Sequence, residues 1–156
     1  MPPSRYFDVQ HERVMALARA AKATGIEMIV LDDGWFGHDR CLDNASLGDW
    51  FADEAKLPRG VEGLVADVNA LGLKFGIWIE PEMVNVNSDL FRAHPEWALA
   101  HPERERSEGR QQLVLDFTRP EVVAHLTERL TALLASANIE CVNGNTNRGA
   151  LLSLAN

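Results

Sequence analysis

The sequence has 156 residues, of which 46% are hydrophobic, and its 15 Lys and Arg against 23 Asp and Glu give a net charge of -8. This composition suits a soluble globular domain with a core and excludes a disordered or fibrous chain. The acidic balance excludes nucleic acid and anionic membranes as partners, because both require clustered Lys and Arg, whereas a neutral substrate is compatible with it.

The first predicted elements are a weak strand at residues 6–9 and a helix at residues 11–23. Apolar side chains recur in the helix at spacings of three and four, which places them on one face. Gly25 follows at the position where a C-terminal cap is expected.

A continuous apolar run at residues 28–31 predicts a parallel strand that is covered on both faces. It ends at Asp32 and Asp33, so these carboxylates are expected at the carboxyl end of a strand. The cycle then repeats, with a helical stripe over residues 61–71 and a strand over residues 73–80.

The second part of the chain continues the alternation of strands and helices. A short helix is expected to start near residues 88–89, and residues 112–116 predict another strand that ends in an acid. Residues 118–121 have the spacing of a capping box with Pro in the first turn. A helical stripe over residues 122–134 follows, and residues 139–142 form the last candidate strand.

Repeated strand-helix units with polar residues at strand ends predict a parallel α/β fold with its chemistry on one face. No GxGxxG motif or P-loop is present, which disfavours a Rossmann-type sheet, while other doubly wound sheets remain open. Five strands compare with the eight strands and roughly 250 residues of a whole barrel. We therefore predict a partial (β/α)₈ TIM barrel of about four to five β/α units, with residues 1–156 as a single truncated domain.

The two cysteines, Cys41 and Cys141, lie far apart and outside any zinc-ligand spacing, so neither a disulfide framework nor a metal site is expected. The first residues do not resemble a signal peptide, and no run approaches the roughly 18 apolar residues of a membrane span. A cytoplasmic location is the expectation that follows.

Asp32 and Asp33 can serve one site only where the strand ends and the chain turns, which Gly34 permits. A capping or turn pair is the alternative. The neighbouring Trp35 favours a sugar site, because such sites combine carboxylates that bind hydroxyls with aromatic faces that stack on the ring.

Trp78 and Glu80 lie two apart on one predicted strand and so share a face. The alternatives are a core aromatic for Trp78 and a buried structural ion pair for Glu80. Arg110, just before the strand at residue 112, is a cation that could hold a carboxylate in place, with a solvated charge as the alternative. The five histidines show no metal-ligand spacing and receive no role.

Three motifs carry a resemblance to a known family. Residues 31–37 (LDDGWFG), 46–50 (SLGDW) and 76–84 (GIWIEPEMV) closely resemble bacterial α-galactosidases of glycoside hydrolase family 36, and the likeness covers roughly residues 6–148. The resemblance implies the catalytic (β/α)₈ barrel of that family, which is normally flanked by two β-rich domains that residues 1–156 do not include.

The resemblance also implies the reaction: retaining hydrolysis of terminal α-linked galactose from galactosides such as melibiose and raffinose. Two carboxyl groups about 5 Å apart perform such chemistry, one as nucleophile and one as acid and then base. No metal or organic cofactor is implied. By resemblance, Asp32 and Asp33 bind the galactose hydroxyls, Trp78 forms an aromatic wall of the pocket, and Arg110 and Asn147 match polar positions of the site.

The sequence departs from the family at the nucleophile. The family's strand there usually ends Lys-Trp-Asp-Met-Asn-Arg, whereas residues 143–148 read Asn-Gly-Asn-Thr-Asn-Arg, so that Asn145 stands in the nucleophile's place and Asn143 in that of the lysine. A neutral amide is a far poorer nucleophile than a carboxylate. The family's acid/base aspartate is expected beyond Asn156. We therefore expect this chain to be an inactive fragment.

A half-barrel is expected to self-associate through its exposed strand edges. The alternative function is a non-catalytic galactoside-binding or interaction module that keeps Asp32, Asp33, Trp78 and Arg110. A related specificity, such as that of an α-N-acetylgalactosaminidase, is a third possibility.

Overall fold

In the computed structural model, the described residues are 7–38, 40–100 and 111–144. The elements follow in the order α1 (His11–Ala23), β1 (Met28–Leu31), α2 (Gly60–Ala70), β2 (Lys74–Ile79), β3 (Met83–Asn85), α3 (Asp89–Ala93), the 3-10 helix η1 (Pro95–Trp97), β4 (Gln112–Val114), α4 (Pro120–Ala135) and β5 (Cys141–Gly144). The predicted helices are confirmed, and so are the predicted strands after α1, α2 and α4, with ends that differ by one or two residues. No helix among these residues is long and apolar enough to cross a membrane.

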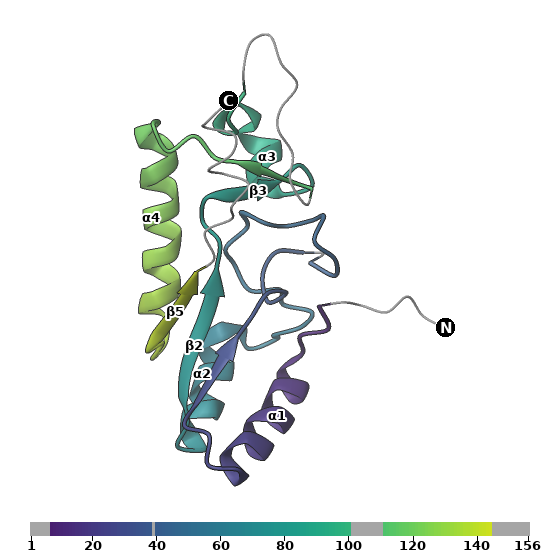
Figure 1. The fold of residues 1–156 in the computed structure, drawn as a ribbon, viewed down its shortest axis with the longest axis vertical. Coiled ribbons are helices and arrows are strands. Elements are labelled where there is room, and N and C mark those ends of the chain that lie inside the picture. Colours follow the sequence, from purple (N-terminus) through teal and green to yellow (C-terminus); the bar gives the residue numbers. More distant parts are fainter. Residues whose placement is uncertain (1–6, 39, 101–110, 145–156) are drawn as a thin grey trace, which may run out of the picture.

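β1, β2 and β5 form a parallel sheet with β2 in the centre. Their arrows point the same way in Figure 1, toward the end of the molecule that carries β3 and α3. β2 is buried at every position after its first residue, as its continuous apolar run predicts. The carboxyl ends of all three strands therefore meet at one edge of the sheet.

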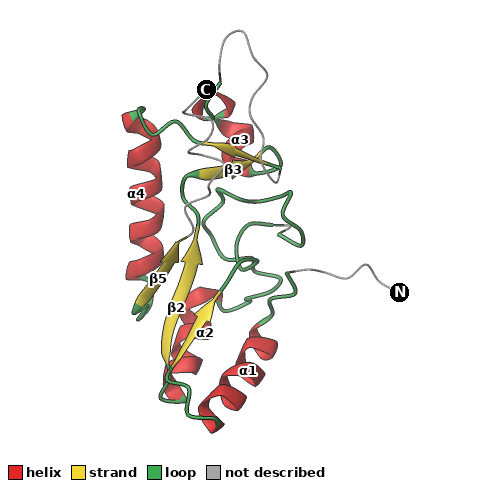
Figure 2. Ribbon diagram, viewed as in Figure 1, coloured by secondary structure: helices red, strands yellow, loops and turns green. Residues whose placement is uncertain are grey.

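Helices lie beside this sheet (Figure 2), and α1, α2 and α4 each supply apolar side chains to the core. α1 and α2 contact each other, and α2 packs on β2. Gly25 ends α1 with a positive φ of 83°, and its N–H bonds the carbonyl of Lys22 at 3.1 Å, so the predicted C-terminal cap is confirmed. The buried residues that α1 and α2 supply to the core are Val14, Met15, Ala18, Val61, Leu64, Val65 and Val68.

Two of the five predicted parallel strands are wrong. Residues 7–9 form no strand, and the Phe7 N–H instead bonds the carbonyl of Cys41 at 3.3 Å. The strand predicted at residues 112–116 exists as β4, but it pairs antiparallel with β3, with Leu113 opposite Val84. The described residues thus hold three parallel strands, and β3 and β4 form a separate two-stranded sheet beyond the carboxyl end of β2.

The capping box predicted at residues 118–121 is also wrong. Arg119 occupies the N-cap position of α4 without a side-chain bond, and the Thr118 hydroxyl donates instead to Asp116 Oδ1 at 2.6 Å. A capping box requires Thr at the N-cap, and here a nearer carboxylate takes the hydroxyl. Pro120 does begin the helix, as predicted.

This contact predicts a measurable pKa. The Thr118 hydroxyl, then its N–H and the Arg119 guanidinium, lower the pKa of Asp116. A lowered pKa in the folded state means that ionised Asp116 stabilises the fold above its unfolded pKa, and that this contribution is lost as the pH falls through the folded pKa. We expect Thr118→Val to raise the pKa of Asp116 in an NMR titration of its carboxyl carbon. Thr118→Ser, which keeps the hydroxyl, is the matched control, and equal pKa values in both variants would contradict the assignment.

Candidate functional site

The turn after β1 places the two adjacent aspartates in different surroundings. Asp32 is exposed, and its Oδ1 accepts the N–H of Asp33 at 2.8 Å. The Asp33 side chain retains 14% exposure. Gly34 follows with φ 105°, and an added Cβ would lie 2.5 Å from the Cβ of Phe7, so only glycine fits this turn. The predicted position of the carboxylates at the end of a strand is confirmed.

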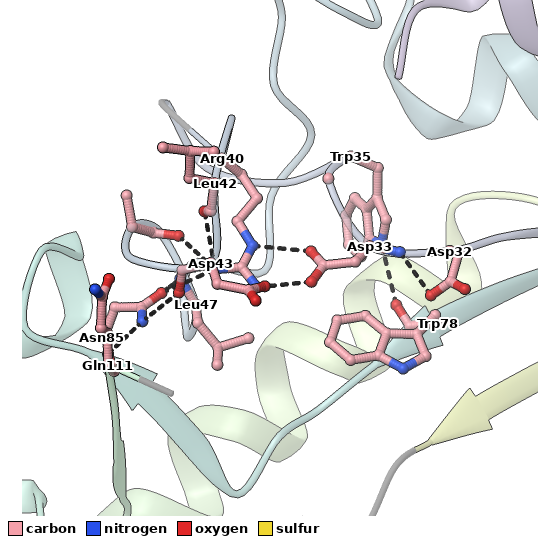
Figure 3. A network of polar contacts seen from close by, with 12 residues as sticks. Asp32, Asp33, Trp35, Arg40, Leu42, Asp43, Leu47, Trp78, Asn85 and Gln111 are labelled. Atoms are coloured by element: carbon pink, nitrogen blue, oxygen red, sulfur yellow. Dashed lines mark hydrogen bonds and ion pairs between the residues drawn. The ribbon is translucent and has the colours of Figure 1, made fainter. Parts of the chain in front are cut away.

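A buried arginine holds Asp33 (Figure 3). Arg40 is fully buried, and it donates from Nε to Asp33 Oδ1 at 2.8 Å and from Nη2 to Asp33 Oδ2 at 2.6 Å. Two such bonds fix the orientation of the Asp33 carboxylate and also pair its negative charge with a positive one. Sequence reasoning missed Arg40 and gave the role of fixed cation to Arg110, which lies outside the described residues.

The remaining donors of Arg40 bond the loop around it. Nη1 donates to the carbonyl of Ala45 at 3.0 Å and to Asn85 Oδ1 at 3.1 Å, with a longer contact to the carbonyl of Leu42 at 3.4 Å. Nη2 also lies 3.5 Å from Asp43 Oδ1. The guanidinium is therefore satisfied in nearly every direction, as a buried cation requires.

Asn85, at the end of β3, extends this network. It is fully buried; its Oδ1 also accepts the N–H of Leu47 at 2.9 Å, and its Nδ2 donates to the carbonyls of Asp43 at 3.0 Å and Gln111 at 2.7 Å. One amide thus joins Arg40, the loop that carries it and the residue that precedes β4 (Figure 3).

A second buried cation supports the backbone of the same turn. Lys56 Nζ donates to the carbonyl of Gly34 at 2.7 Å and to that of Arg40 at 2.6 Å, and it pairs with Asp53 Oδ2 at 3.7 Å. The turn after β1 and the segment with Arg40 are therefore connected twice, by the Asp33–Arg40 ion pair and by the two bonds of Lys56.

Trp78, on β2, lies next to this turn. Its carbonyl accepts the indole N–H of Trp35 at 3.0 Å, and its ring packs against Phe36 and Trp50 with centroid distances of 6.3 Å each. The side chain is 7% exposed, so it belongs to the core as well as to the edge of the sheet. Glu80, which follows the end of β2, is buried too.

Asp49, in the Ser46–Trp50 motif, has a structural role. Its two carboxylate oxygens accept the N–H groups of Asp89 and Leu90, each at 2.9 Å, at the start of α3. Burial raises the pKa of the Asp49 carboxyl, and the two N–H bonds oppose this effect.

We expect Asp49→Asn to destabilise the chain by about 1–3 kcal/mol, because an amide offers one acceptor oxygen to the two N–H donors, of which that of Leu90 is buried. The measurement is the urea concentration at half-unfolding, followed by tryptophan fluorescence. Glu54→Gln, at an exposed position, is the control and should leave the midpoint unchanged. An unchanged midpoint for Asp49→Asn would contradict the bonding described.

β5 brings the segment before Asn145 to the same edge. In the parallel register, Asn143 lies opposite Trp78 and Gly144 opposite Ile79. Asn145 and Asn147 lie outside the described residues, as does Arg110. Within residues 7–38, 40–100 and 111–144, no group of three or more His, Cys, Asp or Glu side chains is arranged to hold a metal ion.

The family model described as Melibiase matches residues 3–153. The chain is 52% identical over 143 residues to alpha-galactosidase AgaA of Geobacillus stearothermophilus, and 42% identical over 143 residues to an alpha-galactosidase of Escherichia coli. Each alignment covers 92% of this chain and 20% of the relative, so the chain spans about a fifth of the length of these relatives.

Solved structures agree with the described fold. The crystal structure of GH36 alpha-galactosidase AgaA from Geobacillus stearothermophilus superposes with a TM-score of 0.84 at 52% identity, over 89% of this chain and 19% of that one. A variant of the same enzyme has been solved in complex with raffinose, with the same TM-score and coverage. An alpha-galactosidase from Thermus thermophilus, at 26% identity, gives a TM-score of 0.73 over 89% of this chain and 28% of its own.

Proposed function

Because the chain belongs to the melibiase family, we propose that it forms the galactose-binding part of the catalytic domain of an α-galactosidase. The whole protein would release terminal α-linked galactose from galactosides such as raffinose, with which a relative has been solved. One observation carries the proposal: the turn with Asp32 and Asp33, the strand with Trp78 and the strand that leads to Asn145 all end at one edge of the parallel sheet.

The proposed roles follow from this geometry and from the resemblance. Asp32 and Asp33 accept hydrogen bonds from sugar hydroxyls, and Trp78 limits the pocket on one side. Arg110 and Asn147 supply further polar contacts. Asn145 stands at the position of the family's nucleophile. In a retaining mechanism, the carboxylate of an aspartate at that position would attack the anomeric carbon.

We further propose that the sheet is part of a (β/α)₈ barrel. Its strands run parallel with helices between them, which is the repeating unit of such a barrel. Within the described residues, β1 and β5 are each paired on one side only, and Val142 on β5 is 45% exposed. A barrel would give each of these strands a second neighbour.

A non-catalytic galactoside-binding module is the second candidate. Both oxygens of Asp33 are held by Arg40 in this chain, whereas position 145, that of the family's nucleophile, carries an amide. Sugar binding can survive the loss of a nucleophile, because hydroxyl recognition and attack on the anomeric carbon use different groups.

A galactose titration of the ¹⁵N-labelled chain tests the binding role that both candidates share. We expect galactose to shift the indole N–H signal of Trp78 in a saturable way, and to leave that of Trp97, which lies in η1, in place. Glucose, which differs in the orientation of one hydroxyl, is the control ligand and should bind more weakly. A folded chain whose Trp78 signal does not respond to galactose would contradict the proposal.

The open strand edges lead to a prediction about association. We expect the chain to sediment as a dimer or a larger species, because unpaired strand edges and exposed apolar side chains favour contact with a second chain. Val142→Lys should shift the population toward monomer in sedimentation velocity. Leu17→Lys introduces the same charge at a residue of α1 that is 68% exposed, and it should have little effect. A monomeric unsubstituted chain would contradict the prediction.

A further inference from the structure

We propose that Arg40 and Asn85 are positioning residues that hold the Asp33 carboxylate in one orientation for a sugar, while the neighbouring Asp32 stays adjustable. The inference rests on the proposed function and adds to it a division of roles between the two aspartates. It also adds two residues that neither the motifs nor the resemblance assign to the site.

The fork of Arg40 determines how the Asp33 carboxylate can rotate. Nε and Nη2 lie in the guanidinium plane and each bonds a different oxygen of Asp33, at 2.8 and 2.6 Å. Two parallel bonds of this kind align the carboxylate plane with the guanidinium plane. Rotation of the carboxylate would break at least one of them, and Arg40 is fully buried, so water cannot replace the lost bond.

The same pairing limits where a ligand can bind Asp33. Each carboxylate oxygen offers about two acceptor positions, and Arg40 takes one on each oxygen. The remaining positions point away from the guanidinium, and the Asp33 side chain keeps 14% of its surface exposed. A hydroxyl can therefore approach Asp33 from one restricted direction, which is a requirement for distinguishing epimeric sugars.

Asn85 holds Arg40 in place in turn. Its Oδ1 accepts from Arg40 Nη1 at 3.1 Å, and its Nδ2 donates to the Gln111 carbonyl at 2.7 Å. Gln111 adopts a positive φ of 61° and follows Arg110 directly in the sequence. The network therefore links Asp33, through Arg40 and Asn85, to Gln111, the residue that precedes β4.

Asp32 contrasts with this arrangement. It is exposed, and the bond that the structure gives its carboxylate comes from the backbone N–H of Asp33. Among the described residues this bond holds only one of the two oxygens, so the Asp32 carboxylate can still turn about it. Asp32 can thus adjust to the sugar after Asp33 has fixed its position.

The test is ¹H–¹⁵N NMR of the 156-residue chain, read at the Arg40 Nε–H and the Trp78 indole N–H during a galactose titration. In the unsubstituted chain we expect a resolved Arg40 Nε–H signal whose proton exchanges slowly with water. This signal should shift together with the Trp78 signal during the titration, because the sugar bonds the same Asp33 oxygens as Arg40. If the Trp78 signal shifts to saturation while the Arg40 signal does not move, the positioning role is overturned.

Arg40→Lys separates positioning from mere charge and space filling, because lysine keeps the cation but lacks the planar fork. We expect it to weaken galactose binding about tenfold or more, equivalent to about 1.4 kcal/mol or more, while the Trp97 indole signal stays in place. Arg92→Lys makes the same exchange at an arginine whose side chain is 56% exposed, and it should leave the affinity unchanged. A folded Arg40→Lys chain with unchanged affinity would overturn the positioning role alone.

Failure of the unsubstituted chain to bind galactose would be a different result. It would overturn the proposed function, and the positioning role with it. If Arg40→Lys does not fold, the Arg40 signal of the unsubstituted chain decides the question without any variant.

Discussion

Restoring the family's nucleophile motif is expected to raise α-galactosidase activity about 10⁴-fold or more, which is the scale of losing a catalytic nucleophile. The experiment places residues 3–153 in the matching segment of the Geobacillus stearothermophilus relative. Residues 143–146 are then either left as they are or changed to Lys-Trp-Asp-Met. An aspartate at position 145 can form the glycosyl-enzyme bond and stabilise the neighbouring positive charge, whereas an amide does neither well.

The measurement is the rate at which each of the two chimeras hydrolyses p-nitrophenyl α-D-galactoside. Asn145→Asp alone should recover part of the activity, and Asn145→Gln, which keeps an amide, is the matched control and should recover none. Equal activity of both chimeras would show that another residue acts as nucleophile. Binding of galactose by both, with turnover by one, would support the assignment of separate groups to recognition and attack.

The second large effect concerns stability. We expect Asp33→Ala to cost about 3–5 kcal/mol, because it removes the carboxylate from a fully buried arginine and leaves that charge without its two-bond partner. Asp32→Ala removes the neighbouring carboxylate, which is exposed, and should change the free energy of unfolding by less than about 0.5 kcal/mol. The two variants have identical chemistry at adjacent positions, so each is the control for the other.

Urea unfolding, followed by circular dichroism and tryptophan fluorescence, measures both variants. Similar midpoints for the two would contradict the buried ion pair. The expected difference also guides the binding experiments, because loss of galactose binding in Asp33→Ala could follow from unfolding. Asp32→Ala and Arg40→Lys are the better probes of the sugar site.

The parts of the fold that could be predicted are those that local pattern determines. The apolar run of β1 and its abrupt end at Asp32 identify a parallel strand, and helical spacing identifies α1, α2 and α4. The predicted cover on both faces of β1 is wrong for the described residues, because Val30 is 41% exposed there. The pairing of β4 could not be predicted, because its partner β3 is only three residues long and a strand's sequence does not state its neighbour. Phe7 and Val9 are residue types that favour strands, but the N–H of Phe7 bonds the loop at Cys41 instead of a neighbouring strand.

The candidate site residues also divide into those that local sequence pattern predicts and those that it does not. Asp32, Asp33 and Trp78 could be predicted as candidates because strand ends and alternation place them, and the structure brings their segments together. Arg40 lies in a loop without periodicity and among polar residues, where an arginine is normally solvated. Its burial depends on Asn85, 45 positions further along the chain. No local signal in the sequence reports such a contact.

The order of these contacts along the chain bears on how the protein is made. The ion pair of Asp33 with Arg40, its support by Lys56 and its link to Asn85 all involve residues that leave the ribosome before β4. β5, which leads to Asn145, is the last described strand and joins the sheet by pairing with β2. Synthesis from the N-terminus therefore allows the network around Asp33 to assemble before Asn145 has been translated. Nascent chains of increasing length, arrested and probed by limited proteolysis, should become protected at residues 32–56 before residues 141–144 emerge.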